Sequence, residues 1–300
     1  MHLEGAQAIA APRAPSPKST MPCLRITADD YGLCSGVNAG IEELAAQGAI
    51  SAVSVMVHDG AALETAHRLG HLAVRTGLHL VFVEERPLSA PFELVGLLTP
   101  SGTLPRSYRD LFARLVLRPS LAVALAREAR RQIERFGTLG LRLDFINSHQ
   151  HTHMFPPVWH ALRDLWSAWP ASQVRLAAGG WASLSAQGAL HLASDLSVLR
   201  GPRLPAHRQV FPLGISHAGA LTTARVAAVL RRFRASALAG RVDRVDAELV
   251  THPGMSDDRT RQAYRHWRYH WEEELNMLRQ PTFDETLAHL GFSREFGRPR

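Results

Sequence analysis

The sequence predicts an α/β fold of parallel βαβ units, which is the pattern of an open α/β sheet or of a (β/α) barrel. The prediction rests on short apolar runs that alternate with longer helical patterns along the 300 residues. No internal repeat is evident, and polar residues gather directly after several of the apolar runs. Because no stretch reads as a linker, we expect one domain over residues 22–295, preceded by a disordered Ala/Pro-rich extension over residues 1–21.

Seven apolar runs are expected to form the strands, and six helical patterns lie between or after them. The strands are expected over residues 23–28, 51–57, 77–83, 141–147, 173–177, 210–215 and 246–251. The helices are expected over residues 37–47, 60–69, 120–136, 158–169, 222–234 and 259–278. The fourth helix follows Pro156-Pro157, and proline suits a first helical turn. In the fifth, Val226, Val229, Leu230 and Phe233 form an apolar stripe at helical spacing. The segment 178–207 is rich in Gly, Ser and Pro and is expected to pass over one face of the fold.

The composition limits the class of protein. A hydrophobic content of 46% is sufficient for a large core, and no apolar run approaches the ~18–20 residues of a membrane span. Two cysteines, Cys23 and Cys34, do not make a disulfide framework, so a reducing cytoplasm is expected. The formal net charge of +7 suits an anionic partner such as a lipid surface. The sequence has no zinc-finger, basic-aromatic or phosphate-loop pattern, which argues against nucleic acid as a partner. Met21 precedes the first strand directly, so translation from either Met1 or Met21 is compatible with the domain.

Polar residues follow four of the expected strands at the ends where parallel α/β folds collect their chemistry. Asp29-Asp30 follows the first strand, His79 lies on the third, the run His149-Gln-His-Thr-His153 follows the fourth, and His252 follows the last. Each has a structural interpretation as well. An Asp pair often caps a helix or a turn, and a single histidine among leucines is commonly a core residue with its hydrogen bonds satisfied.

The run His149-Gln-His-Thr-His153 is harder to explain by packing. In an extended strand all three histidines would share one face, whereas in a helix only His149 and His153 would be neighbours. Both geometries bring these two imidazoles together. Since each buried imidazole would need a hydrogen-bond partner, we favour metal binding or catalysis for this run.

Taken together, the four clusters predict a catalytic metal centre. One carboxylate and two neutral histidines form a three-ligand site with open positions. Adjacent residues on a strand point in opposite directions, so we expect the two aspartates to divide the work, one binding the ion and the other acting as general base. A further histidine, His252 or one from the run, would protonate the leaving group.

Several ordered motifs resemble those of the YdjC-like carbohydrate deacetylases. They are Thr27-Ala-Asp-Asp-Tyr-Gly-Leu with Gly36-Val-Asn, Gly77-Leu-His-Leu, Asn147-Ser-His-Gln-His-Thr-His-Met-Phe-Pro, and Glu248-Leu-Val-Thr-His-Pro-Gly. The resemblance implies a deformed (β/α) barrel like that of the polysaccharide deacetylases, one divalent ion (usually magnesium) and removal of an N-acetyl group from an amino sugar. It implies Asp30, His79 and His149 as metal ligands, Asp29 as base, and His252 as acid or oxyanion partner. It places His151, His153 and Arg175 in the substrate pocket, with Arg175 also orienting Asp29. Tyr31 stands where phenylalanine is usual.

Two stretches, 77–88 and 210–222, look more like the hopanoid-biosynthesis (HpnK) branch than the chitooligosaccharide branch. That likeness implies an N-acetylglucosaminyl hopanoid glycolipid, and the arginines of 127–135 and 225–234 would suit an anionic inner-membrane surface or simply solvent. A chitooligosaccharide deacetylase, a metal-dependent phosphoesterase or amidohydrolase, and a non-enzymatic metal- or lipid-binding protein are the alternatives. The ligand set by itself favours zinc, manganese, cobalt or iron over magnesium. The sequence leaves open whether the protein forms a homodimer.

Overall fold

The structure is a computed structural model that describes residues 23–58, 63–168, 173–176, 209–235 and 246–295. Within these residues, seven parallel strands close into a barrel, which confirms the expected fold class and decides between the barrel and the open sheet. The strands are β1 (Cys23–Tyr31), β2 (Ala52–Val55), β3 (Arg75–Leu80), β4 (Phe145–Ser148), β5 (Gln173–Arg175), β6 (Gln209–Leu213) and β7 (Asp246–Thr251).

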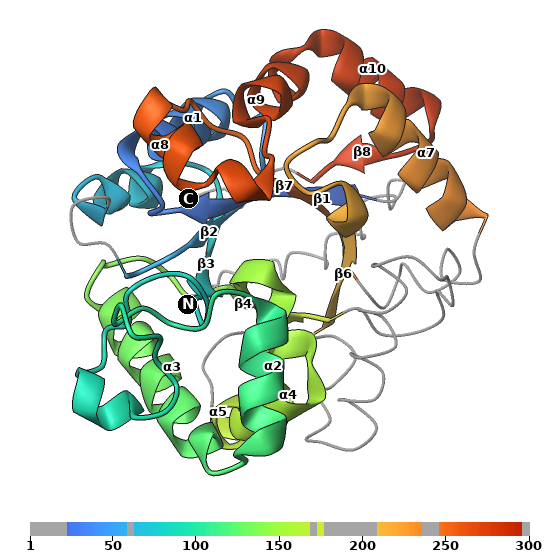
Figure 1. The fold of residues 1–300 in the computed structure, drawn as a ribbon. Coiled ribbons are helices and arrows are strands. Elements are labelled where there is room, and N and C mark those ends of the chain that lie inside the picture. The colour runs from blue at the N-terminus through green and yellow to red at the C-terminus, as the bar shows by residue number, and fades with distance from the viewer. Residues whose placement is uncertain (1–22, 59–62, 169–172, 177–208, 236–245, 296–300) are drawn as a thin grey trace, which may run out of the picture.

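Strand β1 closes the barrel. It pairs in parallel with β7 along residues 24–28 and with β2 from Thr27 onward, so the two ends of the strand order β2-β3-β4-β5-β6-β7 meet on it. Figure 1 looks into the ring, with β1 and β7 above and β4 below. A short strand, β8 (Ser293–Arg294), adds to the beginning of β1. The last strand of the described chain, β8, therefore pairs with the first, β1.

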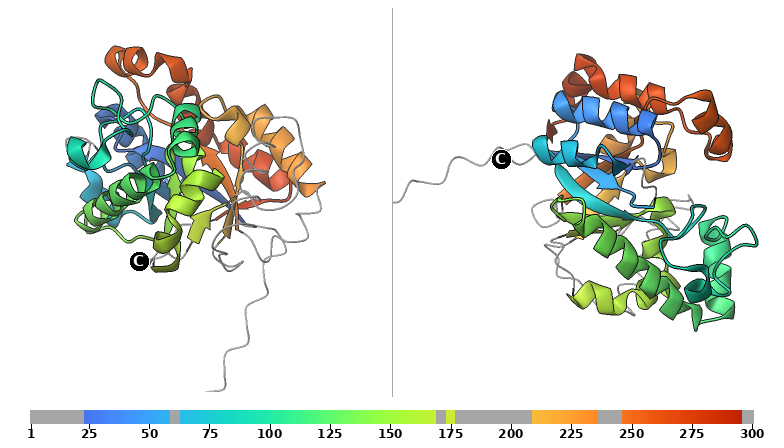
Figure 2. Two further views of the ribbon diagram at one scale, coloured as in Figure 1. Left: turned by 60° about the horizontal axis from the view of Figure 1, so that its bottom comes forward. Right: turned by 90° about the vertical axis from the view of Figure 1, so that its left-hand side faces the viewer.

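Helices surround the barrel, as the two turned views show (Figure 2). In the part of the chain that the structure describes, the helices of at least six residues are α1 (Ser35–Ala46), η2 (Ala66–His71), α2 (Tyr108–Leu117), α3 (Leu121–Gly137), η4 (His149–Met154), α4 (Pro156–Ala161), α5 (Arg163–Ala168), α7 (Thr223–Arg234), α8 (Asp258–Ala263), α9 (Trp271–Arg279) and α10 (Pro281–His289). Short 3-10 turns are η3 (Pro91–Leu94), η6 (Ile215–His217) and η8 (Arg265–Trp267).

The helix boundaries correct several sequence expectations. The helix expected over 158–169 is divided into α4 and α5, and the one expected over 259–278 is divided into α8, η8 and α9. Helices α2 and α10 were not predicted. The helix expected over 60–69 falls partly outside the described residues, and the segments 1–21 and 178–207 lie wholly outside them. Since the break between α8 and α9 turns the chain toward the barrel mouth, it affects the site as well as the fold.

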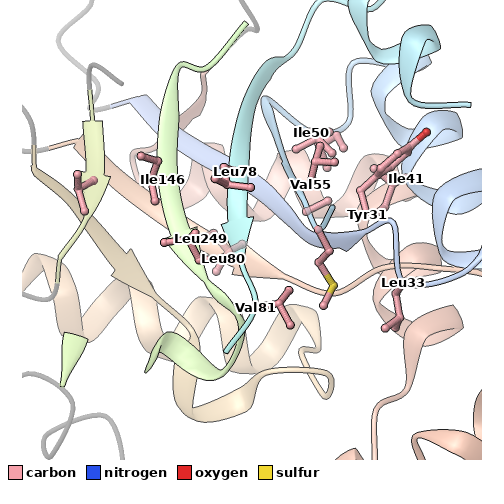
Figure 3. Close-up of a cluster of buried hydrophobic side chains, with 14 of the residues drawn as sticks. Tyr31, Leu33, Ile41, Ile50, Val55, Leu78, Leu80, Val81, Ile146 and Leu249 are labelled. Atoms are coloured by element: carbon pink, nitrogen blue, oxygen red, sulfur yellow. The ribbon is translucent and has the colours of Figure 1, made fainter. Parts of the chain in front are cut away.

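Alternation along the strands separates the apolar core from the polar barrel interior. Leu78 and Leu80 on β3 are fully buried and belong to the main apolar cluster, together with Ile146 of β4 and Leu249 of β7 (Figure 3). His79 lies between the two leucines in sequence, so its side chain leaves β3 on the other face. The core under the helices is thus apolar, and the opposite face of the same strand is free to carry chemistry.

Candidate metal centre and cavity

The predicted site residues gather at the carboxyl ends of the strands, around a cavity of about 650 Å³. Asp29, His79, His149, His151 and His252 all line it. The wall is completed by residues from loops and short helices: Glu84, Arg106, Ser107, Tyr108, Arg109, Ser148, Gln150, Phe155, Ile215, Ser216, Ala218, His266, Trp267 and Tyr269. The structure therefore brings together all four polar clusters of the sequence.

The two aspartates lie inside β1 rather than after it, and they do not point in opposite directions as we expected. The register of β1 against β2 shifts between Ala28 and Tyr31, and Asp30 has a left-handed backbone with φ of 67°. This bulge interrupts the alternation. As a result, Asp29 Oδ2 lies 4.0 Å from His79 Nδ1, and Asp30 Oδ1 lies 3.2 Å from Nε2 of the same ring.

Asp30, His79 and His149 form a compact, buried triad. Their ligand atoms all lie within 4.8 Å of one another, and Asp30 Oδ1 is 3.3 Å from His149 Nδ1. Among the described residues, Asp30 Oδ2 and His79 Nε2 are buried without a hydrogen-bond partner, which is costly unless something else satisfies them. Adjacent donor atoms around one ion at ~2.1 Å lie about 3.0–3.4 Å apart, so the spacings of 3.2 and 3.3 Å from Asp30 Oδ1 to the two histidines suit a divalent cation. Asp30, His79 and His149 therefore fit the divalent metal ion that the sequence motifs implied.

Hydrogen bonds fix the tautomer of His79. Asn147 Nδ2 donates to Asp29 Oδ1 at 3.1 Å, so the amide oxygen of Asn147 faces His79 Nδ1, 2.7 Å away. Since this oxygen can only accept, Nδ1 carries the proton and Nε2 presents its lone pair to the triad. Ser54 Oγ also donates to Asn147 Oδ1. The parallel register places His79 directly beside Asn147, so the sheet itself builds this arrangement.

His149 lies between two carboxylates. Nδ1 faces Asp30 Oδ1, and Nε2 lies 3.3 Å from Glu84 Oε2. Burial by itself would lower the pKa of His149, but the hydrogen bonds to Asp30 and Glu84 raise it to about 10 in the metal-free protein. Trp267 covers the ring at a centroid distance of 4.8 Å.

The run 149–153 is neither an extended strand nor a regular helix, so neither of the two geometries considered for it from the sequence applies. It forms the 3-10 helix η4, in which Gln150 and His151 have left-handed backbones with φ of 50° and 52°. His151 lines the cavity, and its Nδ1 has no hydrogen-bond partner among the described residues. His153 does not line the cavity. Its Nε2 donates to the Arg175 carbonyl at 2.7 Å and its Nδ1 accepts from Ser148 Oγ at 2.6 Å.

Arg175 is buried beneath the cavity and clamps Asp29. It donates to both oxygens of Asp29, at 2.5 and 2.9 Å, and to both oxygens of Glu248, at 2.7 and 3.0 Å. Burial by itself would raise the pKa of Asp29, but the Arg175 guanidinium lowers it well below its usual range. Asp29 is thus an ionised carboxylate whose position is fixed from behind.

His252 follows β7, the strand that pairs with β1. Its backbone N–H donates to the buried carboxylate of Glu274 at 2.6 Å, while Nδ1 has no hydrogen-bond partner among the described residues. Burial lowers the pKa of His252. The loop behind it packs so closely on α1 that a Cβ on Gly40 would lie 2.8 Å from the Cα of Gly254. Small residues on α1 therefore allow this histidine to reach the cavity.

Sequence reasoning missed Ser54, Glu84 and Asn147, together with the aromatic wall of Tyr108, Trp267 and Tyr269. Asn147 stood within a quoted motif at the end of an expected strand, which was the available signal. Glu84 stood within the motif-like stretch 77–88, but nothing in its spacing indicated that it would reach a histidine 65 residues later. Trp267 and Tyr269 lie in the segment 259–278, which was expected to be helical, and Tyr108 lies where no helix or strand was expected.

The fold and the site thus define a (β/α)-barrel protein with an Asp-His-His triad at its mouth whose donor set fits a metal ion. The family described as YdjC-like protein matches residues 23–289, and the chain belongs to that family. Carbohydrate deacetylases from three organisms are similar to it. The first, from Vibrio cholerae serotype O1 (strain O395), is 36% identical over 132 residues, which is 43% of this chain and 49% of the relative. That from Oceanobacillus iheyensis is 34% identical over 139 residues (45% and 56%), and that from Geobacillus stearothermophilus is 32% identical over 142 residues (47% and 54%).

The aligned part of the chain spans about half the length of these relatives. A solved structure from Enterococcus faecalis V583, provisionally described as a cellobiose-phosphate cleavage protein, superimposes with a TM-score of 0.68 at 18% identity. The superposition covers 92% of this chain and 98% of that one. At this identity the likeness concerns the fold, and it agrees with the barrel found here.

Proposed function

We propose that the protein is a metal-dependent carbohydrate deacetylase that hydrolyses the N-acetyl group of an amino sugar. The observation that carries the proposal is the buried triad Asp30, His79 and His149, which lies in a cavity directly beside an ionised Asp29. The names of the related carbohydrate deacetylases support the choice of an acetylated sugar as substrate.

In this proposal Asp30, His79 and His149 hold the ion, which supplies Lewis-acid polarisation of the scissile carbonyl and acidifies water. Asp29 accepts the proton of the attacking water. Its two oxygens are held by Arg175, so the carboxylate is oriented before substrate binds. Because its pKa is low, Asp29 is a weak base and depends on an acidified water.

His252 is the group placed to donate a proton to the leaving amine, since it lines the cavity with Nδ1 free of a partner among the described residues. Its lowered pKa makes its protonated form a strong but scarce acid. His151 lines the cavity and contacts substrate. We assign Arg175 and His153 to positioning, because both are buried behind Asp29 and neither lines the cavity.

The identity of the ion is part of the proposal. Family resemblance favours magnesium, but magnesium prefers oxygen ligands, and two imidazoles with one carboxylate suit zinc, manganese or cobalt better. Elemental analysis of protein purified without added metal tests this. A stoichiometric transition metal is expected, whereas magnesium alone would contradict the argument from ligand chemistry.

The central experiment replaces His149 by alanine and measures both bound metal and acetate released from an N-acetylglucosamine oligosaccharide. Both are expected to be lost. The matched control is His71→Ala, because His71 is an exposed histidine that does not line the cavity. Full activity in His149→Ala would refute the proposal. Release of phosphate from sugar phosphates, with no acetate from any acetylated sugar, would favour the phosphoesterase alternative.

We further propose that the acetylated sugar is carried on a lipid, as in an N-acetylglucosaminyl hopanoid, with a free chitooligosaccharide as the alternative. Aromatic side chains support binding of a sugar with an apolar extension. Tyr108 stacks on Phe155 at a centroid distance of 5.3 Å, and Trp267 and Tyr269 face the same cavity. Comparing acetate release from the glycolipid and from the oligosaccharide decides between these substrates.

An exposed apolar surface supports peripheral contact with an anionic bilayer. It consists of Phe92 and Val95 near η3, Val116 and Leu117 at the end of α2, and Val123 of α3, with Phe92 and Leu117 each 80% exposed. Helix α3 contacts both η3 and α2. From residue 91 to 135 the sequence has eight arginines against four acidic residues. Apolar side chains framed by cations are the pattern of an interfacial contact.

Sedimentation with phospholipid vesicles tests this contact. Binding is expected when the vesicles contain phosphatidylglycerol, and the Phe92→Ser, Leu117→Ser double variant should weaken it. No binding to the vesicles that contain phosphatidylglycerol would refute the contact. None of the helices in the described part of the chain combines the length and the apolar character required to cross a bilayer. A cytoplasmic location and a homodimer stay predictions, the latter checked by light scattering.

A further inference from the structure

We propose that Glu84 is a positioning residue that fixes the imidazole of His149 and thereby sets the affinity of the site for its metal. The inference rests on the proposed metal site and adds a residue that the sequence did not indicate. The geometry points to it because Glu84 lies on the far side of the His149 ring from Asp30, with Oε2 3.3 Å from Nε2.

The chemistry of the partners decides the tautomer. A carboxylate can only accept, so the ring nitrogen that faces Glu84 must carry a proton. With Nε2 protonated, Nδ1 is the nitrogen left to bind an ion, and Nδ1 is the atom directed at Asp30 Oδ1. A carboxylate that holds a metal-ligating histidine by its second nitrogen fixes the ring orientation and raises the basicity of the ligand.

The local structure holds Glu84 in this position. Its backbone is left-handed, with φ of 68°, and its N–H donates to the Pro105 carbonyl at 2.8 Å. A left-handed backbone is unfavourable for glutamate and persists only where the surroundings enforce it. The carboxylate also accepts from His266 Nε2 at 2.7 Å and from Trp267 Nε1 at 2.9 Å. Both of these donors belong to η8, so Glu84 also ties this turn over the His149 ring.

The adjacent residue offers a matched control. Glu85 carries the same charge one position later, but its carboxylate contacts Tyr264 Oη at 3.0 Å and His58 Nε2 at 3.3 Å and does not line the cavity. Replacing Glu85 therefore removes an equal charge from the same loop. It leaves the His149 hydrogen bond in place.

The test measures dissociation constants for Zn²⁺ and Mn²⁺ by competition with a chelating dye, for the intact chain and three variants. Glu84→Ala is expected to weaken binding by about 10–100-fold. Glu84→Gln keeps an oxygen that can accept from Nε2–H and should lie closer to the unsubstituted protein than to the alanine variant. Glu85→Ala should bind within a few-fold of the unsubstituted protein. Unchanged binding by Glu84→Ala, or equal weakening in all three variants, would overturn the proposal.

A second measurement does not depend on any variant folding. In the Zn²⁺-loaded protein, ¹⁵N NMR of the His149 ring should show a protonated Nε2 and a coordinated Nδ1. The opposite assignment refutes the role of Glu84 directly. If the unsubstituted protein binds no metal or releases no acetate, the proposed function fails. If it does both while Glu84→Ala behaves identically, only this inference fails.

Discussion

The two histidines of the triad are held in different ways. His79 belongs to the floor of the site, where its partner Asn147 lies on the neighbouring strand in direct register and offers a neutral amide. His149 belongs to the rim, where its partner Glu84 comes from a loop and offers a charged carboxylate. The floor is thus built by the sheet, and the rim by loops that the sheet does not constrain. The difference teaches that one site can combine a ligand fixed by strand register with one whose position depends on loop closure.

The floor should show the largest effect on catalysis. Asp29→Asn keeps the shape of the side chain but removes the proton acceptor, so turnover should fall by about 10²–10⁴-fold. Metal content should be retained, because Asp29 is not part of the triad. The neighbouring Asp30→Asn should instead lose metal. Equal metal loss in both variants, measured by elemental analysis, would show that the two aspartates do not divide their roles.

The floor should also show the largest effect on stability. Arg175→Met leaves the buried carboxylates of Asp29 and Glu248 facing each other without a cation, which is expected to cost about 3–5 kcal/mol. The control is Arg68→Met, which breaks the exposed pair with Glu42 and should cost less than about 1 kcal/mol. Denaturation by guanidinium chloride measures both. Similar costs would mean that the clamp does not stabilise the floor.

Much of the floor could be predicted from the sequence. Apolar runs ending in Asp, His or Asn are visible signals, and parallel strands bring their carboxyl ends to one edge of the barrel. Asp29, His79 and His252 therefore converge as expected. The directions of the side chains were less predictable. The bulge at Asp30 and the left-handed backbone of His151 depend on pairing and packing that strand alternation does not contain.

The rim could not be predicted, because its contacts depend on loop closure over long separations. Glu84 meets His266 and Trp267 across more than 180 positions. The break between α8 and α9 interrupts the single helix that was expected over 259–278. Only the folded chain shows that Trp267 and Tyr269 leave the helical path to line the cavity.

Replacing Asn147, the neutral partner of His79, tests the comparison between the two histidines directly. Asn147→Ala removes the neutral anchor of His79 and should weaken metal binding by about 10–100-fold. Asn147→Asp gives His79 a carboxylate like that of His149, but this carboxylate would face Asp29, to which Asn147 now donates. The repulsion between two buried carboxylates should make the aspartate variant less stable than the alanine variant. Dye competition and denaturation measure the two effects. An aspartate variant that binds metal normally would show that the neutral anchor is not required.

We also expect the sign of the pH dependence of stability to change when metal binds. In the metal-free protein the pKa of His149 is raised from 6.5 to about 10, so the folded state keeps a proton that the unfolded state releases. The stabilisation is fully present below pH 6.5 and is lost as the pH rises towards 10, by up to about 1.4 kcal/mol per pH unit.

With metal bound, Nδ1 of His149 holds no proton, and the unfolded state binds more protons below pH 6.5. The stability of the metal-loaded protein should then rise with pH up to 6.5. Above pH 6.5 it should lack the fall that His149 causes in the metal-free protein. Guanidinium denaturation of chelator-treated and metal-loaded protein between pH 5 and 10 gives both curves. Parallel curves would mean that the proton on His149 is not displaced by the ion, and that the rim histidine differs from the floor histidine in its anchor alone.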